Sequence, residues 1–335
     1  MTHPYMLEIR DLHVHFRVYE GVSRVLDSVS LNVKRGERVG LAGETGCGKT
    51  VTMKAVMGVL KTPPAIIPRG EVILDGQDVL EMSANELLRI KGRKISMIFQ
   101  DPMNALNPVF TVGEQLCDVI RFAQRDSGDG RKRLSPEIHD RAVAALEEVR
   151  LPDPERILNS YPLELSGGMR QRVLIAMALV NGPSFLIADE PQTALDVTIG
   201  AQILELLSEL VKTKGISVLL ITHNLGVIQE TTERVYVMYA GQVAEAAPTA
   251  LLFENPKHPY TRGLLASVPR LTGGKIAEGI RGTVPDYTVA PSGCRFHPRC
   301  DHVMPICSQR RPPPFLAEPD HDVGCWLYGE KGATQ

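Results

Sequence analysis

The chain has 335 residues, of which 43% are hydrophobic, and its 37 basic and 39 acidic side chains leave a net charge of −2. This length and composition allow a substantial core for one large domain plus an appendage, and they exclude a fibrous or disordered protein. The longest aliphatic run, VLIAMALV at 173–180, is far shorter than the roughly 20 residues that cross a bilayer. The near-neutral charge also argues against nucleic acid as a partner, because proteins that bind it usually carry a basic field.

The N-terminal stretch MTHPYMLEIRDLHV lacks a basic start followed by an apolar segment, so we expect no export signal and a cytoplasmic location. In that reducing compartment, a cluster of cysteines is better explained by a metal than by disulfides. Such a cluster stands near the C-terminal end, where three of the six cysteines fall within GCRFHPRCDHVMPICSQ at 293–309.

Alternating apolar and polar residues predict short β-strands in MLEIRDLHVHF at 6–16 and in VLDSVSLNVKRGERVGLAG at 25–43. The second segment leads directly into a glycine-rich loop. From about 135 to 180 the pattern is helical: SPEIHDRAVAALEEV has apolar residues three and four apart and Pro136 near its start.

Two later apolar runs, SFLIADE at 184–190 and ISVLLITHN at 216–224, are typical of strands in the centre of a parallel sheet. The helical segment TIGAQILELLSELVKTKG at 198–215 separates them. This order of elements predicts a βαβ arrangement.

The composition and periodicity of the chain change after about residue 250, where proline becomes frequent and long periodic segments disappear. We therefore expect one domain at 1–250, with its helical part at about 112–180, and a second region at 251–335.

The stretch GETGCGKT at 43–50 fits the phosphate-loop pattern, and RVGLA before it and VTMKAVMGVL after it supply the required strand and helix. Backbone N–H groups of such a loop point at phosphates, Lys49 places its charge on the β and γ oxygens, and the Thr50 hydroxyl ligates Mg²⁺. A chance glycine-rich turn is the alternative, which the flanking elements disfavour. We expect these residues to bind ATP: Gly43, Glu44, Thr45, Gly46, Cys47, Gly48, Lys49 and Thr50.

A second part of a phosphate site should be an acid at the end of another buried strand, and FLIADE provides it. We expect Asp189 to hold Mg²⁺, directly or through water, and Glu190 to polarise the attacking water. A solvated acidic pair at a strand end is the alternative interpretation.

Four further segments accompany these two sites: MIFQDP at 97–102, LSGGMRQR at 165–172, TALD at 193–196 and ITHN at 221–224. In this order and spacing, and over essentially the whole chain, the motifs resemble the ATPase subunit of ABC transporters. The resemblance implies an α/β fold, with a P-loop parallel-sheet core, an antiparallel β subdomain, a helical subdomain and a small irregular C-terminal metal-binding extension.

In the family, ATP lies between two such domains, which implies that Ser166, Gly167 and Gly168 contact the ATP of a partner subunit. These residues open a predicted helix, whose positive N-terminal end suits a γ-phosphate. The resemblance also implies that His223 contacts the γ-phosphate and that Gln100 joins magnesium or water to the contact with the membrane partner. The implied catalytic residues are Glu190, His223 and Gln100, and the implied magnesium ligands are Thr50, Gln100 and Asp189.

Adenine in the family stacks on an aromatic residue shortly after the first strand. Phe16 fits this place best, and Tyr19 is the alternative because the turn FRVYEG can present either ring.

The segments FQDPMNALNPVFTVGEQ at 99–115 and FENPKHPYTRGLLASVP at 253–269, with the cysteine-rich end, resemble importers of dipeptides and oligopeptides. This group also includes nickel and some glycoside transporters. The resemblance implies two permease subunits, an extracytoplasmic solute-binding protein and a second ATPase subunit, commonly non-identical, with a homodimer as the alternative. It places the chain peripherally on the cytoplasmic face of the inner membrane. The sequence departs from this group of importers at two places. Gln192 stands where the group usually has Thr, and GETGCGKT replaces a Ser-rich loop. Neither departure removes a phosphate contact.

Cys294, Cys300, Cys307 and Cys325 form the candidate metal centre, since four thiolates suit either tetrahedral Zn²⁺ or a [4Fe-4S] cluster. Structural zinc sites use shorter C-x₂₋₄-C knuckles, and the resemblance favours the iron–sulfur cluster; no metal at all is the third alternative. His297, His302 and His321 are nearby substitutes as ligands, although surface histidines explain them as well. We expect a structural role, because a proline-rich tail builds little core of its own.

The main functional hypothesis is therefore an ATPase that powers import of peptides, with nickel complexes, opines and oligosaccharides as other solutes. A soluble ABC-type ATPase in DNA repair or translation is the alternative, but such proteins usually carry paired domains or long coiled-coil insertions. An inactive regulatory subunit is disfavoured because Lys49, Asp189, Glu190 and His223 are all present.

Overall fold

The computed structural model describes residues 3–124, 136–193, 195–267 and 279–329. The chain divides into two compact units, which we describe separately. Unit 1 comprises Met1–Lys34, Arg38–Leu80 and Leu220–Gln335, and unit 2 comprises Arg35–Glu37 and Glu81–Leu219. Among the described residues, no helix has the length and apolar character needed to cross a membrane.

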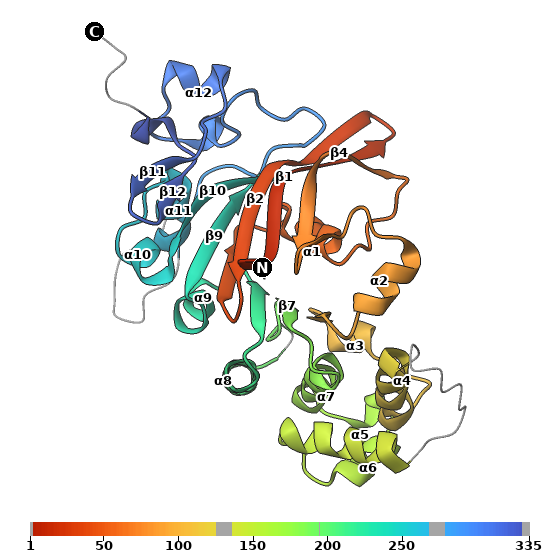
Figure 1. Ribbon diagram of the computed structural model, residues 1–335. Coiled ribbons are helices and arrows are strands. Elements are labelled where there is room, and N and C mark those ends of the chain that lie inside the picture. Colours follow the sequence, from red (N-terminus) through yellow and green to blue (C-terminus); the bar gives the residue numbers. More distant parts are fainter. Residues whose placement is uncertain (1–2, 125–135, 194, 268–278, 330–335) are drawn as a thin grey trace. The chain divides into compact units, whose positions relative to one another are not determined.

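Unit 1 contains a four-stranded antiparallel sheet in the order β2-β1-β4-β5 (Figure 1). Its strands are β1 (Tyr5–Val18), β2 (Gly21–Lys34), β4 (Ala65–Leu74) and β5 (Gln77–Asp78). In β1 the apolar side chains of Leu7 and Ile9 are buried, whereas Arg10 is exposed. The strands predicted at 6–16 and at the start of 25–43 are therefore present, because one face of each is packed in a core.

A second set of strands in unit 1 runs in the order β11-β12-β10-β9-β3. β3 and β9 are parallel, and the remaining neighbours are antiparallel. These strands are β3 (Arg38–Ala42), β9 (Arg234–Tyr239), β10 (Gln242–Pro248), β11 (Phe315–Glu318) and β12 (His321–Val323). The helices of unit 1 are α1 (Lys49–Val56), α9 (Leu225–Thr231), α10 (Thr249–Glu254), α11 (Pro259–Ala266) and α12 (Pro305–Gln309), with 3₁₀ turns η3 (His297–Arg299) and η4 (Trp326–Tyr328).

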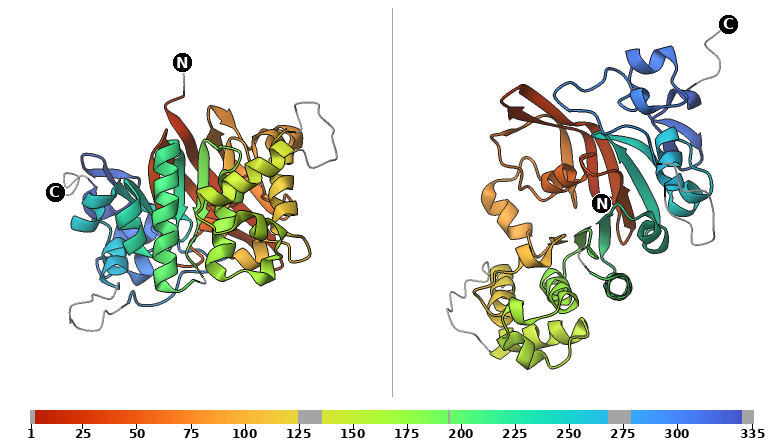
Figure 2. Two further views of the ribbon diagram at one scale, coloured as in Figure 1. Left: turned by 90° about the horizontal axis from the view of Figure 1, so that it is seen from below. Right: turned by 180° about the vertical axis from the view of Figure 1, so that it is seen from behind.

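Unit 2 is mainly helical around the parallel pair β6 (Ile95–Ile98) and β7 (Phe185–Asp189). Its helices are α2 (Ala84–Ile90), α3 (Pro102–Ala105), α4 (Val112–Gln124), α5 (Pro136–Glu148), α6 (Pro154–Asn159), α7 (Gly167–Leu179) and α8 (Val197–Lys214), with the 3₁₀ turn η2 (Pro162–Glu164). Helices α4 to α7 pack together (Figure 1), and Figure 2 shows α8 along its length.

The elements expected at 184–224 are β7, α8 and β8 (Ser217–Ile221), in that order. Every residue of β7 and of β8 is buried. This agrees with the uninterrupted apolar runs that predicted strands covered on both faces. The boundary between the two units falls within β8.

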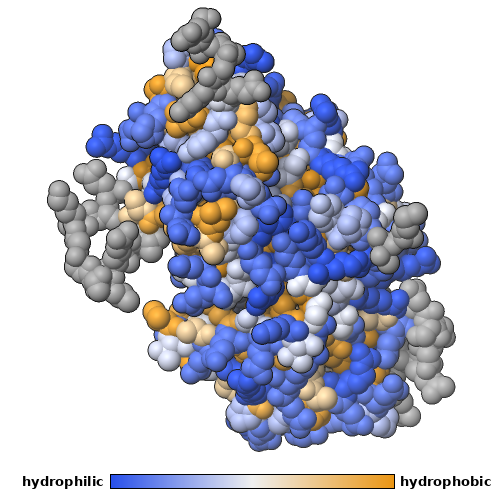
Figure 3. Space-filling view, turned by 60° about the vertical axis from the view of Figure 1, so that its left-hand side comes forward, coloured by the Kyte–Doolittle hydropathy of each residue, from blue (hydrophilic) through white to orange (hydrophobic). Residues whose placement is uncertain are grey.

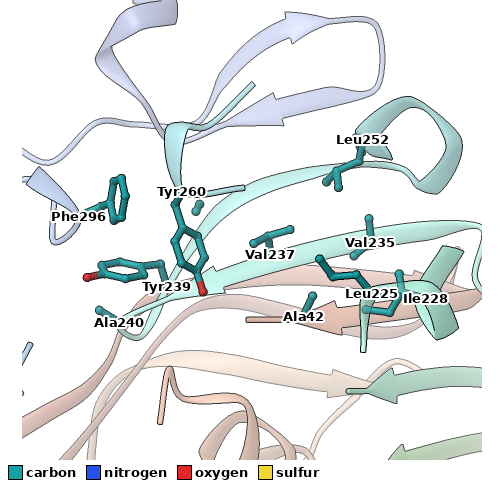
Figure 4. Close-up of a cluster of buried hydrophobic side chains, with 12 residues drawn as sticks. Ala42, Leu225, Ile228, Val235, Val237, Tyr239, Ala240, Leu252, Tyr260 and Phe296 are labelled. Atoms are coloured by element: carbon teal, nitrogen blue, oxygen red, sulfur yellow. The ribbon is translucent and has the colours of Figure 1, made fainter. Parts of the chain in front are cut away.

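The region after residue 250 shares the core of unit 1. Leu252, Tyr260 and Phe296 belong to one buried cluster with Val237 and Tyr239 of β9 (Figure 4). The three rings lie together, with centroids 4.7 Å apart for Tyr239 and Tyr260 and 5.0 Å apart for Tyr239 and Phe296. This aromatic contact joins the C-terminal region to β9 by burying a large apolar area.

The surface differs from this interior in composition. On the face in Figure 3, hydrophobic residues form separate small patches among hydrophilic ones. Apolar side chains are instead concentrated in strands such as β3, where Val39 and Leu41 are fully buried. Burial of this apolar surface is the main favourable contribution to folding.

Candidate nucleotide-binding site

The phosphate loop lies between β3 and α1 in unit 1, in the context that the pattern required. Gly43 has φ 147°, and a Cβ there would lie 2.2 Å from the carbonyl oxygen of Met238. Gly48 has φ 108° and precedes α1, where a Cβ would lie 2.7 Å from Leu26 Cδ2. Only glycine fits these two positions, because the backbone is left-handed and the surroundings are close.

Helix α1 begins at this loop with no side chain capping its first N–H groups. Such a helix terminus binds anions, since its N–H groups and its dipole favour negative charge. Thr45, Gly46 and Thr50 are exposed to solvent, so this side of the loop is accessible. The arrangement suits a phosphate group.

Lys49 is 7% exposed, and its ammonium donates to the carbonyl oxygens of Gly43, at 2.7 Å, and Glu44, at 3.0 Å. Its stem is therefore packed within the loop, and its charge lies beside the loop carbonyls. Cys47 is fully buried, and this burial raises the pKa of its thiol. The thiol stays protonated, as expected for a residue that positions backbone and is not a nucleophile.

His223 lies in the same unit as the phosphate loop. The N–H of Thr222 donates to the carbonyl oxygen of Leu41 at 3.4 Å, two residues before Gly43. The His223 side chain is exposed, and Asn224 caps α9 by accepting from the N–H of Gly226 at 3.0 Å. His223, which follows β8, therefore lies beside β3, the strand that precedes the phosphate loop.

Unit 2 brings Gln100 and Glu190 together. β6 and β7 are parallel with Ile98 opposite Ala188, so the residues that follow both strands emerge at the same edge. The Gln100 amide donates to Glu190 Oε2 at 3.2 Å. Asp189, the last residue of β7, is 8% exposed.

The backbone of Glu190 is strained, since its φ of 45° is uncommon for a residue with a side chain. Thr193 supports it in two ways: its hydroxyl donates to Glu190 Oε2 at 2.9 Å and its N–H donates to the Glu190 carbonyl at 3.0 Å. Thr193 is the first residue of TALD, and the motif by itself does not indicate these contacts, although a hydroxyl residue three positions after a strand-end acid is a signal for such a turn.

The segment LSGGMRQR begins α7 in unit 2, as the sequence predicts. Ser166 is the N-cap, and its hydroxyl accepts from the N–H of Met169 at 3.4 Å. A Cβ at Gly168 would lie 2.7 Å from Ile199 Cγ2 of α8, and one at Gly167 would lie 3.2 Å from Leu195. These glycines therefore also allow α7 and α8 to pack closely, a role that the motif by itself does not reveal.

The two candidates for adenine stacking differ in exposure. Phe16 is partly buried in β1, opposite Ser23 and Ala65. Tyr19 lies in the turn after β1 and is fully exposed. Which ring contacts adenine stays a prediction.

The four C-terminal cysteines are all free thiols in unit 1. Burial raises the pKa of Cys294 and Cys325 to about 11, and neighbouring thiols act in the same direction on both. The N–H of Cys294 donates to the carbonyl oxygen of Cys307 at 2.8 Å, so two of the cysteine-bearing segments are hydrogen-bonded.

The expected metal-binding extension is not supported by this arrangement. Within residues 3–124, 136–193, 195–267 and 279–329, no group of three or more His, Cys, Asp or Glu side chains is placed to hold a metal. Of the nearby histidines, His297 Nδ1 lies 2.9 Å from the Cys294 carbonyl oxygen, and His321 Nε2 lies 2.6 Å from Glu245 Oε1.

A strand, a glycine-rich loop and a helix with a buried lysine define a P-loop nucleotide-binding protein. Comparison with protein families is consistent with this class: the ABC transporter family matches residues 26–193, and the C-terminal region of oligopeptide/dipeptide transporters matches residues 244–307. The chain belongs to the ABC transporter family, as an ATP-binding subunit with the ABC ATPase fold.

Curated relatives cover nearly the whole chain. A probable peptide ABC transporter ATP-binding protein, y4tR of Sinorhizobium fredii, is 45% identical over 97% of this chain and 96% of its own length. The oligopeptide transport ATP-binding protein OppD of Bacillus subtilis is 44% identical over 96% of this chain and 88% of its own length. Among solved structures, a dimeric post-hydrolysis state of the ATP-binding cassette MJ0796 bound to ADP and Pi is 30% identical, with a TM-score of 0.63 over 73% of this chain and 99% of that one.

Proposed function

We propose that this chain hydrolyses ATP to power the import of peptides through a membrane permease. The observation that carries the proposal is the presence, in one chain, of a complete phosphate loop at 43–50 and a C-terminal region of the oligopeptide/dipeptide transporter type at 244–307. The relatives named for peptide and oligopeptide transport support the choice of solute.

The residues divide the chemistry as follows. Lys49 and the N–H groups at the start of α1 would bind the β and γ phosphates, and Thr50, Gln100 and Asp189 would be the ligands of Mg²⁺. Glu190 polarises the attacking water, since its carboxylate is already oriented by hydrogen bonds from Gln100 and Thr193. His223 contacts the γ-phosphate. Magnesium, when bound, neutralises charge that develops on the phosphate oxygens.

Two such subunits would bind ATP between them. The N-terminus of α7 at Ser166, Gly167 and Gly168 is our candidate contact to the ATP of the partner subunit, because it presents helix N–H groups. The partner ATPase is a non-identical subunit or a second copy of this chain. Closure of the pair on ATP would move the permease subunits, and hydrolysis would reset them.

From the same likeness we infer that the chain would lie peripherally at the cytoplasmic face of the membrane, against two permease subunits. An extracytoplasmic solute-binding protein would deliver the solute to that permease.

A transport assay tests the function. The chain, purified with its permease partners from the native host and reconstituted in proteoliposomes, should take up labelled di- and oligopeptides only when ATP is supplied. Uptake restricted to nickel complexes, opines or oligosaccharides would replace peptide as the solute. A partner set without any permease would contradict the transport function and favour a role in repair or translation.

For the four cysteines we propose a [4Fe-4S] cluster, with zinc as the alternative. The support is the donor set, four thiols in unit 1: Cys294, Cys300, Cys307 and Cys325. The segments that carry Cys294 and Cys307 are hydrogen-bonded through their backbones. Binding would require the thiols to ionise. Purification without oxygen followed by assays for iron, sulfide and zinc tests this: about four iron and four sulfide per chain would support the cluster, and their absence would refute it.

A further inference from the structure

We infer that the C-terminal region holds the phosphate loop in shape through three positioning residues, Tyr260, Tyr287 and Arg299, and so sets the affinity of the chain for ATP. This inference rests on the proposed binding of ATP at 43–50. All the residues concerned belong to unit 1.

Two tyrosine hydroxyls bond to the backbone of the loop. Tyr260 Oη accepts from the N–H of Glu44 at 2.9 Å, and the Tyr287 hydroxyl donates to the carbonyl oxygen of Gly46 at 2.5 Å. The two bonds lie on either side of Thr45, so they fix the orientation of the peptide groups around it.

Arg299 holds the same loop by its side chain. Its guanidinium pairs in a bidentate manner with Glu44, at 2.7 Å to Oε2 and 3.1 Å to Oε1, and the Arg299 side chain is only 6% exposed. Paired and shielded from water, this contact is stronger and more directional than an exposed ion pair.

The three side chains are themselves fixed. The Tyr260 ring is fully buried and packs on Tyr239 and Phe296, with centroid distances of 4.7 and 5.5 Å (Figure 4). Arg299 Nε donates to the carbonyl oxygen of Arg281 at 2.7 Å, and its guanidinium lies 5.6 Å from the Tyr239 ring centroid. The Tyr287 ring lies 5.7 Å from the guanidinium of Arg295. Each group therefore reaches the loop from a rigid support.

A further contact reaches the loop at Cys47. Arg295 Nη1 donates to the carbonyl oxygen of Ala240 at 2.5 Å, in the turn between β9 and β10. The next residue, Gly241, donates its N–H to the carbonyl oxygen of Cys47 at 2.8 Å. The C-terminal region therefore supports the loop directly at Glu44 and Gly46 and, through this turn, at Cys47.

Such support matters because the loop is intrinsically flexible. Gly43, Gly46 and Gly48 all have positive φ, and glycine has more backbone freedom to lose than any other residue. A loop that is already ordered before ATP arrives loses less entropy on binding, and this raises affinity. Contacts that only anchored the C-terminal region would change stability without changing affinity.

The experiment compares the variants Tyr260→Phe, Tyr287→Phe and Arg299→Gln with two matched controls, Tyr328→Phe and Arg262→Gln. The control pair lies in the same region, where Arg262 donates to Tyr328 Oη at 3.0 Å and Tyr328 donates to the carbonyl oxygen of Lys257, away from the loop. The full chain is titrated with Mg·ATP by calorimetry, and its unfolding is followed without nucleotide.

We expect each test variant to raise the Kd for Mg·ATP by about 5- to 10-fold, in line with the loss of one hydrogen bond or ion pair. The controls should stay within about twofold of the parent chain. In addition, the double variant Glu44→Gln/Arg299→Gln should have a Kd for Mg·ATP no higher than that of the weaker-binding single variant. The two effects are not additive because both substitutions remove the same ion pair.

Unchanged Kd in all three test variants would overturn the inference, and so would an equal rise in the controls. A parent chain that binds no ATP at all would instead refute the proposed function, so the two failures are distinguishable.

Discussion

Lys49 illustrates how one side chain can serve both the loop and its ligand. The residue is almost completely buried and its ammonium donates to two loop carbonyls, so the charge is already beside the loop that would bind a phosphate. A buried ammonium must be paired, and phosphate oxygens provide stronger partners than carbonyls do.

Replacement of Lys49 by Ala should weaken Mg·ATP binding by about 10- to 100-fold, because a charge-assisted hydrogen bond to phosphate is lost. Equilibrium titration with Mg·ATP measures this change. Lys54→Ala is the matched control, since Lys54 is exposed on the same helix. An unchanged affinity for Lys49→Ala would remove the phosphate-loop assignment.

Glu190 is the residue at which backbone and side chain are both unusual. Its positive φ costs free energy, and two donors converge on one carboxylate oxygen. Strain of this kind persists where the surrounding contacts enforce it, and Thr193 provides two of those contacts.

The variant Glu190→Gln should bind ATP normally but hydrolyse it at least about 100-fold more slowly, because an amide is a far weaker base than a carboxylate. Phosphate release and ATP binding are measured on the same preparation. Glu205→Gln, at an exposed position of α8, is the control. Near-normal turnover in Glu190→Gln would contradict the role of Glu190 as the base.

Helix α11 depends on a buried acid in β10. Glu245 is fully buried and accepts from the N–H groups of Lys257, at 2.7 Å, and His258, at 2.9 Å. Burial by itself would raise the pKa of Glu245, but the hydrogen bonds from His321 and from these N–H groups hold it below its usual value. His258 in turn caps α11, since its Nδ1 accepts from the N–H of Tyr260 at 3.0 Å.

This helix start should make stability depend on pH. Burial lowers the pKa of His258 from 6.5 to about 4, so between these values the unfolded chain takes up a proton that the folded chain does not. The contribution of neutral His258 to the free energy of unfolding is therefore fully present above pH 6.5. It is lost as the pH falls toward 4, and the loss is about 3 kcal/mol in total.

Urea unfolding of the parent chain and of His258→Asn between pH 4 and 7 measures this loss. Asparagine can still cap the helix but does not titrate, so the variant should lose clearly less stability than the parent. Glu245 also contributes to acid lability and is common to both chains. Parallel pH curves for the two chains would contradict the assignment.

In the whole molecule, the region after residue 250 is part of unit 1. It supplies Tyr260 and Phe296 to the core, and β12 pairs with β10 through Glu245 and Ala246. Loss of this region would expose an apolar cluster and an unpaired strand edge, both of which promote aggregation.

A chain truncated after Ala250 should therefore aggregate or melt at a markedly lower temperature, as measured by size-exclusion chromatography and circular dichroism. A chain that ends at Gly329 keeps the contacts described for the C-terminal region and serves as control. A truncated chain that stays monomeric with an unchanged melting temperature would show that the region contributes nothing to unit 1.

Patterns close together in the sequence were sufficient for much of the nucleotide site. The strand before Gly43, the helix after Gly48, and the strand that ends at Asp189 all follow from local periodicity and glycine placement. The cap of α7 at Ser166 follows in the same way, because capping depends on residues within one helical turn.

Three other properties depend on the folded chain. Tyr260, Tyr287 and Arg299 contact loop residues from which they are separated by 216, 241 and 255 positions in the sequence. No local pattern encodes such pairs. The φ of Glu190 is likewise enforced by its surroundings, not by its own preference. The cysteine spacing predicts four metal ligands, whereas the raised pKa of Cys294 and Cys325 follows from their burial, which the spacing does not reveal. Local structure is set by short-range sterics and hydrogen bonds that a sequence displays directly, but long-range contacts and burial exist only once the chain has packed.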